Sequence, residues 1–233
     1  DQDDVWHPEK LASIEATFAD HPEAGAVCSD AELVDEHLRP LGSTLWQALN
    51  FVPGARGRSG GSRRAADAPI LKPMLGLTLA LHARFREAIL PFPPEHGHDV
   101  WAALVIDCLS GIALIERPLV KYRQHPRQQY GVTATTGIRQ RLAATRLCGR
   151  ASFDSAASFY EQACRRIREL GLAEAHAERW GFLRDKAEHL RARARLPERR
   201  LSRLPIISRE LGLMRYHHYS NGAWSAAKDL FIL

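Results

Sequence analysis

Residues 98–125 read HDVWAALVIDCLSGIALIERPLVKYRQH, and this stretch decides between the fold classes. Its first part, residues 98–111, is apolar over several helical turns and ends in glycine, so it predicts a core helix that stops at Gly111. Residues 112–125 then predict a β-strand that Pro118 interrupts. A buried helix leading directly into a strand is typical of layered α/β proteins.

The segments on the N-terminal side continue this alternation. Residues 7–22 predict a helix, because Pro8 suits the first turn and apolar residues recur at helical spacing. Residues 25–35, GAVCSDAELVD, predict a strand followed by a turn. Residues 75–90, LGLTLALHARFREAIL, predict a strand passing into a short helix. Between them, residues 51–69 are rich in Gly, Arg, Ser and Pro and predict a mobile basic loop.

The C-terminal part of the chain has a different character. Three amphipathic helices with arginine-rich faces are predicted, over residues 155–170, 176–196 and 205–220. Residues 131–233 hold 19 Lys and Arg against 10 Asp and Glu, whereas residues 1–130 have a net charge of −4. We therefore expect two domains, residues 1–130 and residues 131–233, of which the second favours an anionic partner.

The composition excludes several classes of protein. With 233 residues and 45% apolar content, the chain can build a sizeable core. No apolar run approaches the roughly 18 residues needed to span a bilayer, and the N-terminal residues do not resemble a secretory signal. We expect a cytoplasmic protein whose widely spaced cysteines are reduced thiols: Cys28, Cys108, Cys148 and Cys164.

Three carboxylates open the chain in the sequence DQDD, residues 1–4. Asp1 and Asp3 before a helix could coordinate a hard divalent cation, which binds oxygen ligands and holds substrate phosphates. The alternative is that Asp4 caps the following helix while Asp1 and Asp3 lie in solvent. The four residues alone leave both interpretations open.

A second polar group precedes the predicted core helix. Asp99 follows His96 and His98 at the helix start, and a carboxylate in such a turn is a candidate general base. The same three residues also resemble half of a hydrolase zinc motif, but Val100 stands where that motif needs another histidine. Helix capping by Asp99 is the structural alternative.

A third polar group ends the predicted strand. Arg123 and His125 follow residues 112–122 at the entrance to a loop. An arginine beside a histidine suits the binding of a diphosphate. A solvated strand end is the simpler explanation for both side chains.

The order and spacing of these groups carry more information than any one of them. Five segments follow one another along the chain in this order: DQDDVWHPEKL, VCSDAELVDE, GLTLALHARFREAILPFP, HDVWAALV and RPLVKYRQH. Together they resemble the second half of a bacterial family 2 glycosyltransferase, and more narrowly the rhamnosyltransferase-like branch that builds cell-surface polysaccharide. The resemblance covers about residues 1–130, and RYHHYSNGAWSAAKDL, residues 215–230, is similar to the tail of that branch.

The resemblance implies a partial GT-A fold, which is Rossmann-like and would lack its N-terminal nucleotide-binding strands. About a hundred residues precede the acidic motif in that family, so the chain is expected to be a fragment with little activity alone. The parent protein would move a sugar, with rhamnose as the candidate, from a nucleotide-sugar donor to a saccharide or lipid-linked acceptor.

The resemblance also assigns the donor side. Asp1 would lie near the ribose of the nucleotide, and Asp3 would hold Mn²⁺ or Mg²⁺ against the diphosphate. Arg123 and His125 match a segment that closes over the diphosphate, with His125 as a second metal ligand. Asp4 would cap the next helix.

On the acceptor side, Asp99 matches the general base, which would deprotonate the attacking hydroxyl in an inverting displacement. Gly76 and Thr78 match a segment between donor and acceptor, and His98 and Trp101 flank the base as acceptor-binding residues. We expect no nucleic-acid partner, because no recognition helix or stacking motif accompanies the basic residues.

Two interpretations of the basic helices remain. They could hold the enzyme against anionic lipid on the inner face of the cytoplasmic membrane, helped by the apolar ending AAKDLFIL. They could equally be helices with solvated arginine faces that pack on the catalytic domain. A different class of function is also open, in which the chain is a non-catalytic membrane-surface or scaffold module and the acidic opening is only a helix cap.

Overall fold

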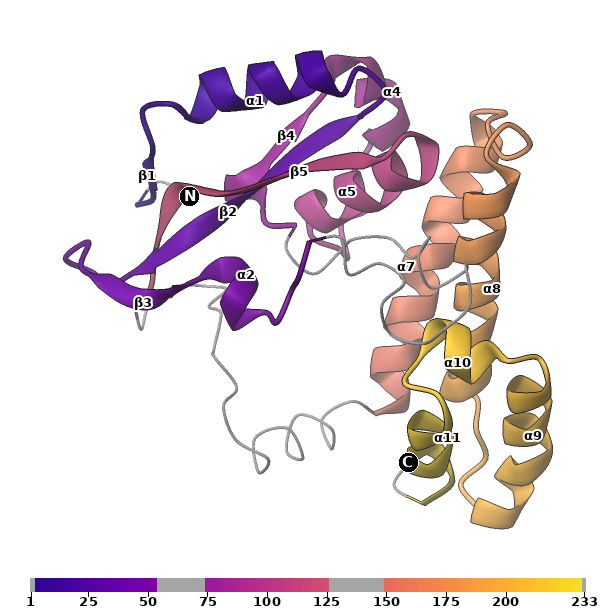
Figure 1. The fold of residues 1–233 in the computed structure, drawn as a ribbon. Coiled ribbons are helices and arrows are strands. Elements are labelled where there is room, and N and C mark those ends of the chain that lie inside the picture. Colours follow the sequence, from indigo (N-terminus) through magenta and orange to yellow (C-terminus); the bar gives the residue numbers. More distant parts are fainter. Residues whose placement is uncertain (1–2, 54–73, 126–148, 232–233) are drawn as a thin grey trace. The chain divides into compact units, whose positions relative to one another are not determined.

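The computed structural model describes residues 3–53, 74–125 and 149–231, and Figure 1 shows its ribbon. These residues belong to two compact units, the first made of residues 3–53 and 74–125 and the second of residues 149–231. Asp1, most of the predicted basic loop, and the expected domain boundary near residue 130 lie outside the described residues.

The first unit is built on an open mixed sheet whose inner strand is β2 (Ala26–Val34). Strand β5 (Ile112–Arg123) runs parallel to one edge of β2, and β1 (Val5–Trp6) pairs antiparallel with β5. On the other edge of β2, β3 (Pro40–Thr44) and β4 (Leu79–Leu81) pair antiparallel. With helices beside this sheet in Figure 1, the predicted α/β class is confirmed.

Helices were predicted over residues 7–22, in the second part of residues 75–90 and over residues 98–111, and the structure has a helix in each of these ranges. Helix α5 (His98–Leu109) is buried continuously from Trp101 to Leu109, which explains why its sequence is apolar on every side. The chain then turns at Gly111, where φ is 140° and the backbone N–H donates to the Ile106 carbonyl. The other helices are α1 (Lys10–Asp20), α2 (Leu45–Ala48), η1 (Gly76–Thr78), η2 (Ala83–Phe85) and α4 (Arg86–Ile89).

Pro118 does not interrupt the strand, so this prediction was wrong. β5 is continuous through Pro118, and its register with β2 shifts on either side of Asp30, the residue that pairs with Pro118. A register shift of this kind lets the strand include a proline, which cannot donate a backbone hydrogen bond, without ending there.

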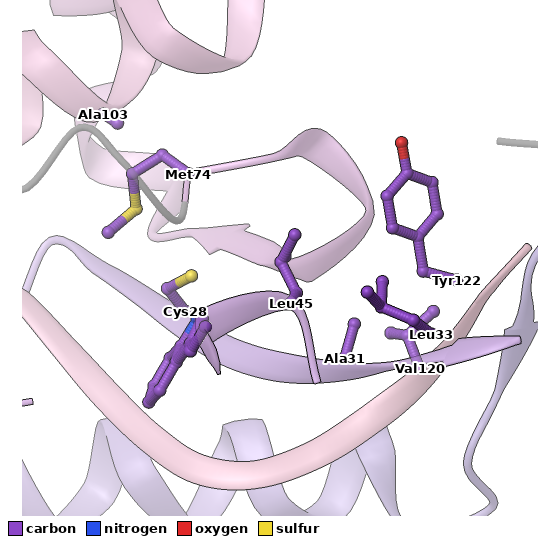
Figure 2. Packing of buried hydrophobic residues seen from close by; sticks show 9 residues of the cluster. Cys28, Ala31, Leu33, Leu45, Met74, Ala103, Val120 and Tyr122 are labelled. Atoms are coloured by element: carbon purple, nitrogen blue, oxygen red, sulfur yellow. The ribbon is translucent and has the colours of Figure 1, made fainter. Parts of the chain in front are cut away.

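The apolar core takes side chains from β2 on both sides of the register shift. On β2, Cys28 lies before the shift and Ala31 and Leu33 lie after it, yet all three belong to one apolar cluster (Figure 2). The extra residues of this irregularity lie on β5, which advances from Ile115 to Lys121 while β2 advances from Ser29 to Glu32. Leu45, Trp46, Met74, Ala103, Val120 and Tyr122 complete the cluster.

The described part of the second unit contains only helices. The predicted helices over 155–170 and 176–196 are confirmed as α7 (Arg150–Glu169) and α8 (Ala177–Ala194). The third predicted helix is two helices, because Met214 has a left-handed φ of 56° between α9 (Leu204–Gly212) and α10 (Arg215–Tyr219). A short η3 (Arg200–Arg203) precedes α9, and α11 (Ala223–Phe231) ends the described chain.

Not all arginines of these helices face solvent. Arg193 on α8 is 6% exposed and donates through Nε and Nη2 to the two oxygens of Asp229 at 2.6 and 2.8 Å. Asp229 is fully buried and also accepts from the Tyr216 hydroxyl at 2.7 Å. The interpretation with solvated arginine faces, one of the two left open, therefore does not hold at the α8–α11 contact.

The described cysteines, Cys28, Cys108 and Cys164, are buried thiols that form no disulfide with one another. Burial raises the pKa of the Cys28 and Cys164 thiols to about 12, so both are protonated at neutral pH. Among the described helices, none is both long enough and apolar enough to cross a bilayer.

Candidate active site

Arg123 is the last residue of β5 and joins three segments at the carboxyl ends of the parallel strands. Its backbone N–H donates to Asp4 Oδ1 at 3.0 Å, and its Nε donates to the Asp3 carbonyl oxygen at 2.9 Å. Its Nη1 donates to the carbonyl of Glu36, just beyond β2. Because this guanidinium donates to neutral backbone carbonyls, its positive charge remains available to an anion. Ligands of open α/β sheets bind at this end of parallel strands.

Asp3 and His125 meet beside Arg123. The His125 Nε2 atom lies 3.1 Å from Asp3 Oδ2, although 122 positions separate the two residues in the sequence. Both side chains are partly open to solvent, with exposed fractions of 27% for His125 and 41% for Asp3. The structure thus brings together three of the four residues expected to bind the donor, while Asp1 lies outside the described residues.

The same pair determines how well the expected cation would fit. A carboxylate oxygen and an imidazole nitrogen are suitable ligands for Mn²⁺, whereas Mg²⁺ prefers oxygen alone. Within residues 3–53, 74–125 and 149–231, no three His, Cys, Asp or Glu side chains converge as a metal site. Asp3 and His125 could therefore supply two ligands, and substrate oxygens and water would have to supply the rest.

Asp99 lies in the first turn of α5, and both its oxygens accept backbone hydrogen bonds. Oδ2 accepts from the Gly76 N–H at 3.0 Å, and Oδ1 accepts from the Val100 N–H at 2.8 Å. A side chain at Gly97 would bring its Cβ within 2.9 Å of Oδ1, so glycine at this position leaves room for the carboxylate. Each oxygen keeps a further lone pair that could accept a proton.

The four expected acceptor-binding residues divide into two pairs. Gly76 and His98 lie around the Asp99 carboxylate, and the His98 side chain is exposed with its ring 5.9 Å from that of Phe92. Thr78 and Trp101 lie beneath the surface, at 1% and 2% exposure.

The polar atoms of the buried pair are used internally. Thr78 Oγ1 donates to the Leu75 carbonyl at 3.0 Å, and Trp101 Nε1 donates to the Ile89 carbonyl at 2.9 Å. Thr78 and Trp101 therefore support the surface that bears Asp99 rather than forming it.

Both capping alternatives are contradicted. Helix α1 begins after Glu9 without a side-chain cap, and Asp4 instead accepts from the Arg123 backbone. Helix α5 has Gly97 at its N-cap, also without a side-chain cap, and Asp99 lies inside the first turn. Asp4 binds a backbone N–H from a distant segment, and Asp99 binds one N–H of its own helix, that of Val100, and one from the distant Gly76.

Lys10 contacts a residue beside each polar group, Trp6 near the acidic opening and Leu77 next to Gly76. The sequence did not identify it as a site residue. It is 5% exposed, its Nζ donates to the Leu77 carbonyl at 2.7 Å, and it lies 3.8 Å above the centre of the Trp6 ring. Burial lowers the pKa of its amine to about 8, although Asp4 acts in the opposite direction. No helical spacing indicates this contact, because Trp6 lies in β1 and Lys10 is the first residue of α1.

Trp6 extends the candidate surface beyond the donor side. Its side chain is 55% exposed and lines a cavity of about 340 Å³ on the β1–β5 side of the sheet, together with Glu32 and Lys121. An open aromatic ring beside charged groups can take the apolar face of a polar ligand. The sequence placed Trp6 inside the acidic motif but assigned it no role.

No family model, curated protein or solved structure matches this chain.

Proposed function

We propose that the first unit is the metal-binding and acceptor-binding side of a glycosyltransferase that uses a nucleotide-sugar donor. The observation that carries this proposal is the contact between Asp3, Arg123 and His125. The family resemblance assigned these residues to one site, and they approach each other from segments about 120 positions apart. A helix cap or a solvated strand end would not require that contact.

In the proposed reaction, Asp99 takes the proton of an acceptor hydroxyl while the hydroxyl oxygen attacks the anomeric carbon of the donor. The new glycosidic C–O bond forms as the bond from the anomeric carbon to the nucleoside diphosphate breaks, which inverts the configuration. Gly76 N–H and Val100 N–H hold the carboxylate during this step. Arg123 contributes positive charge toward the departing diphosphate.

A divalent cation held by Asp3 and His125 would offset the negative charge of the leaving group. The exposed ring of Trp6 would bind the apolar face of a sugar, so that the carboxylates act at the reacting centre. The identity of the sugar, with rhamnose as the candidate, depends on the family resemblance alone.

The general base is tested by Asp99→Asn in the full-length protein. The amide keeps the size of the side chain but cannot accept the proton, so transfer should fall about 10²–10⁴-fold. Binding of the donor should stay within about twofold, because Asp99 is assigned to the acceptor. Asp20→Asn is the matched control, since Asp20 is exposed at the end of α1. Normal transfer by Asp99→Asn would exclude this residue as the base.

The metal site is tested by titrating Mn²⁺ into Asp3→Asn and His125→Ala and measuring free Mn²⁺ by electron paramagnetic resonance. Each variant should bind Mn²⁺ more weakly than the parent and should need more of it for half-maximal transfer, and EDTA should abolish the parent's activity. Glu15→Gln, on the exposed side of α1, is the control. Unchanged Mn²⁺ affinity in both variants would show that Asp3 and His125 do not bind the cation.

A further inference from the structure

The second unit exposes an apolar stripe along α11. Trp224 is 66% exposed and Phe231 is 61% exposed, and Ala227 between them is also exposed. Residues three, four and seven positions apart lie on one face of a helix, so these three side chains form a continuous surface. Large aromatic side chains that gather on one exposed helix face mark an interaction surface more often than isolated ones do.

The opposite face of α11 explains why this stripe stays exposed. Asp229 is fully buried, where it is paired with Arg193 and accepts a hydrogen bond from the Tyr216 hydroxyl. Rolling the aromatic residues into the core would carry Asp229 toward solvent and leave the Arg193 charge buried without its partner, which is strongly unfavourable. The orientation of α11 is therefore set by its polar contacts.

A second apolar pair lies at the C-terminal end of α11. Arg203 of η3 donates to the carbonyls of Asp229 and Leu230 at 2.9 and 3.3 Å, and so holds η3 against the last turn of α11. This contact brings Leu201 and Leu204, which are 79% and 41% exposed, to the end of the helix that bears Phe231.

Positive charge surrounds this end of the unit. Arg199 and Arg200 are exposed and directly precede Leu201, and Lys228 lies in the last turn of α11. Apolar side chains flanked by basic ones complement the interface of an anionic bilayer, where apolar groups enter below the headgroups and arginines meet the lipid phosphates.

We propose that Trp224, Phe231, Leu201 and Leu204 enter the interface of an anionic phospholipid bilayer, while Arg199 and Arg200 bind lipid phosphates. The chain would then lie on the bilayer surface through its second unit. This inference does not depend on sugar transfer, because it rests on residues of the second unit alone.

The test is flotation of the whole chain with vesicles of phosphatidylcholine, with and without 30 mol% phosphatidylglycerol. Trp224→Ser with Phe231→Ser should lower the partition coefficient on the anionic vesicles about tenfold or more, because two large apolar side chains are lost. Leu11→Ser with Val52→Ser is the control, since both residues are exposed in the first unit. Equal binding by the stripe variant and the parent would overturn the proposal.

The charges are tested with Arg199→Gln and Arg200→Gln. Each change should lower binding to the anionic vesicles about fivefold and leave binding to phosphatidylcholine unaltered, since one arginine near such a surface contributes on the order of a fivefold effect. Arg39→Gln and Arg86→Gln, in the first unit, are the matched controls. An equal loss from all four variants would show attraction by net charge rather than by this surface.

Depth and self-association provide independent readouts. Lipids brominated on the upper acyl chain should quench the tryptophan fluorescence of the parent, and Trp224→Phe should remove most of that quenching while still binding vesicles. Sedimentation velocity tests the competing occupant, a second copy of the chain. If the stripe variant loses a dimer and keeps its vesicle binding, the stripe is a protein interface and the proposal fails.

Discussion

Two charged clusters, one in each unit, differ in how deeply they are buried. In the first unit, Asp3, Arg123 and His125 lie at the rim of an apolar core and remain partly exposed. In the second unit, Arg193 and Asp229 lie inside and satisfy each other. A buried pair with complete hydrogen bonding serves the architecture, because nothing else can reach it. Partly exposed groups that distant segments hold together are available to a ligand.

The largest effect that this contrast predicts is on the stability of the second unit. Asp229→Asn removes the negative charge and leaves the Arg193 guanidinium buried without a counter-ion, which should cost about 3–5 kcal/mol of unfolding free energy. Amide hydrogen exchange of peptides from residues 149–231 would measure the loss in this unit separately from the first.

Asp154→Asn is the matched control, because Asp154 also pairs with an arginine but is 60% exposed. Its loss should stay within about 1 kcal/mol. Replacing the buried pair together, as Arg193→Met with Asp229→Leu, should recover much of the stability, since apolar residues of similar size carry no desolvation cost. Similar losses from Asp229→Asn and Asp154→Asn would show that the buried pair has no special weight.

A second prediction concerns Lys10, the buried cation of the first unit. Its pKa is lowered to about 8 in the folded chain, against an ordinary value of 10.5, so between these values the unfolded chain binds the extra proton. Stability should therefore rise with pH across that window, by about 1–3 kcal/mol relative to Lys10→Met. Hydrogen exchange between pH 7 and 10.5 would measure the difference. Parallel curves for the parent and Lys10→Met would contradict the lowered pKa.

In the second unit, the corresponding group is His189, and its window is acidic. Burial lowers its pKa, even though the Glu210 carboxylate, 2.8 Å from Nδ1, acts in the opposite direction, with Arg193 and Asp229 also nearby. Its contribution to stability is complete above about pH 6.5 and is lost as the pH falls toward the folded-state pKa. The slope is at most about 1.4 kcal/mol per pH unit.

His189→Gln should flatten this slope in the second unit and leave the first unit unchanged. The amide can still bond to Glu210 and to Ser220, which lies 3.0 Å from the imidazole Nε2, so the fold should persist. His37→Gln, at an exposed turn of the first unit, is the control. An acid slope that survives in His189→Gln would assign the transition to another group.

Much of the first unit could be predicted from the sequence, because local signals determined it. The core helix ending at Gly111 and the strand after it follow from apolar pattern and glycine alone. The effect of Pro118 could not be predicted, since it depends on the partner strand, where a register shift at Asp30 accepts it. Local sequence carries no information about the neighbouring strand.

The candidate site shows the same limit. The aspartates and Asp99 were identified as chemically interesting, but their partners were not, because Asp4 and Asp99 bind backbone N–H groups that any residue can provide. In the second unit, a solvated face was one of the two interpretations of the arginine-rich helices. Asp229, 36 residues beyond Arg193, reverses that interpretation, and no local pattern links the two.

The smallest predicted effect compares one surface ion pair from each unit. Arg117 contacts Glu9 at 2.7 Å with both side chains more than half exposed, so Arg117→Gln should cost about 0.5 kcal/mol or less. Arg191 is only 21% exposed and binds both Glu161 and Asp154 between α7 and α8, so Arg191→Gln should cost more, about 1 kcal/mol. Water already solvates the first pair, whereas the second neutralises two carboxylates that repel each other.

Both free-energy costs would be measured by urea unfolding with and without 0.5 M NaCl, which is about three to four times physiological ionic strength. Screening by the added salt should reduce both costs. A larger loss of stability in Arg117→Gln than in Arg191→Gln would show that side-chain exposure does not determine how much each ion pair stabilises this chain. The contrast between the two units would then hold only for the buried Arg193–Asp229 pair.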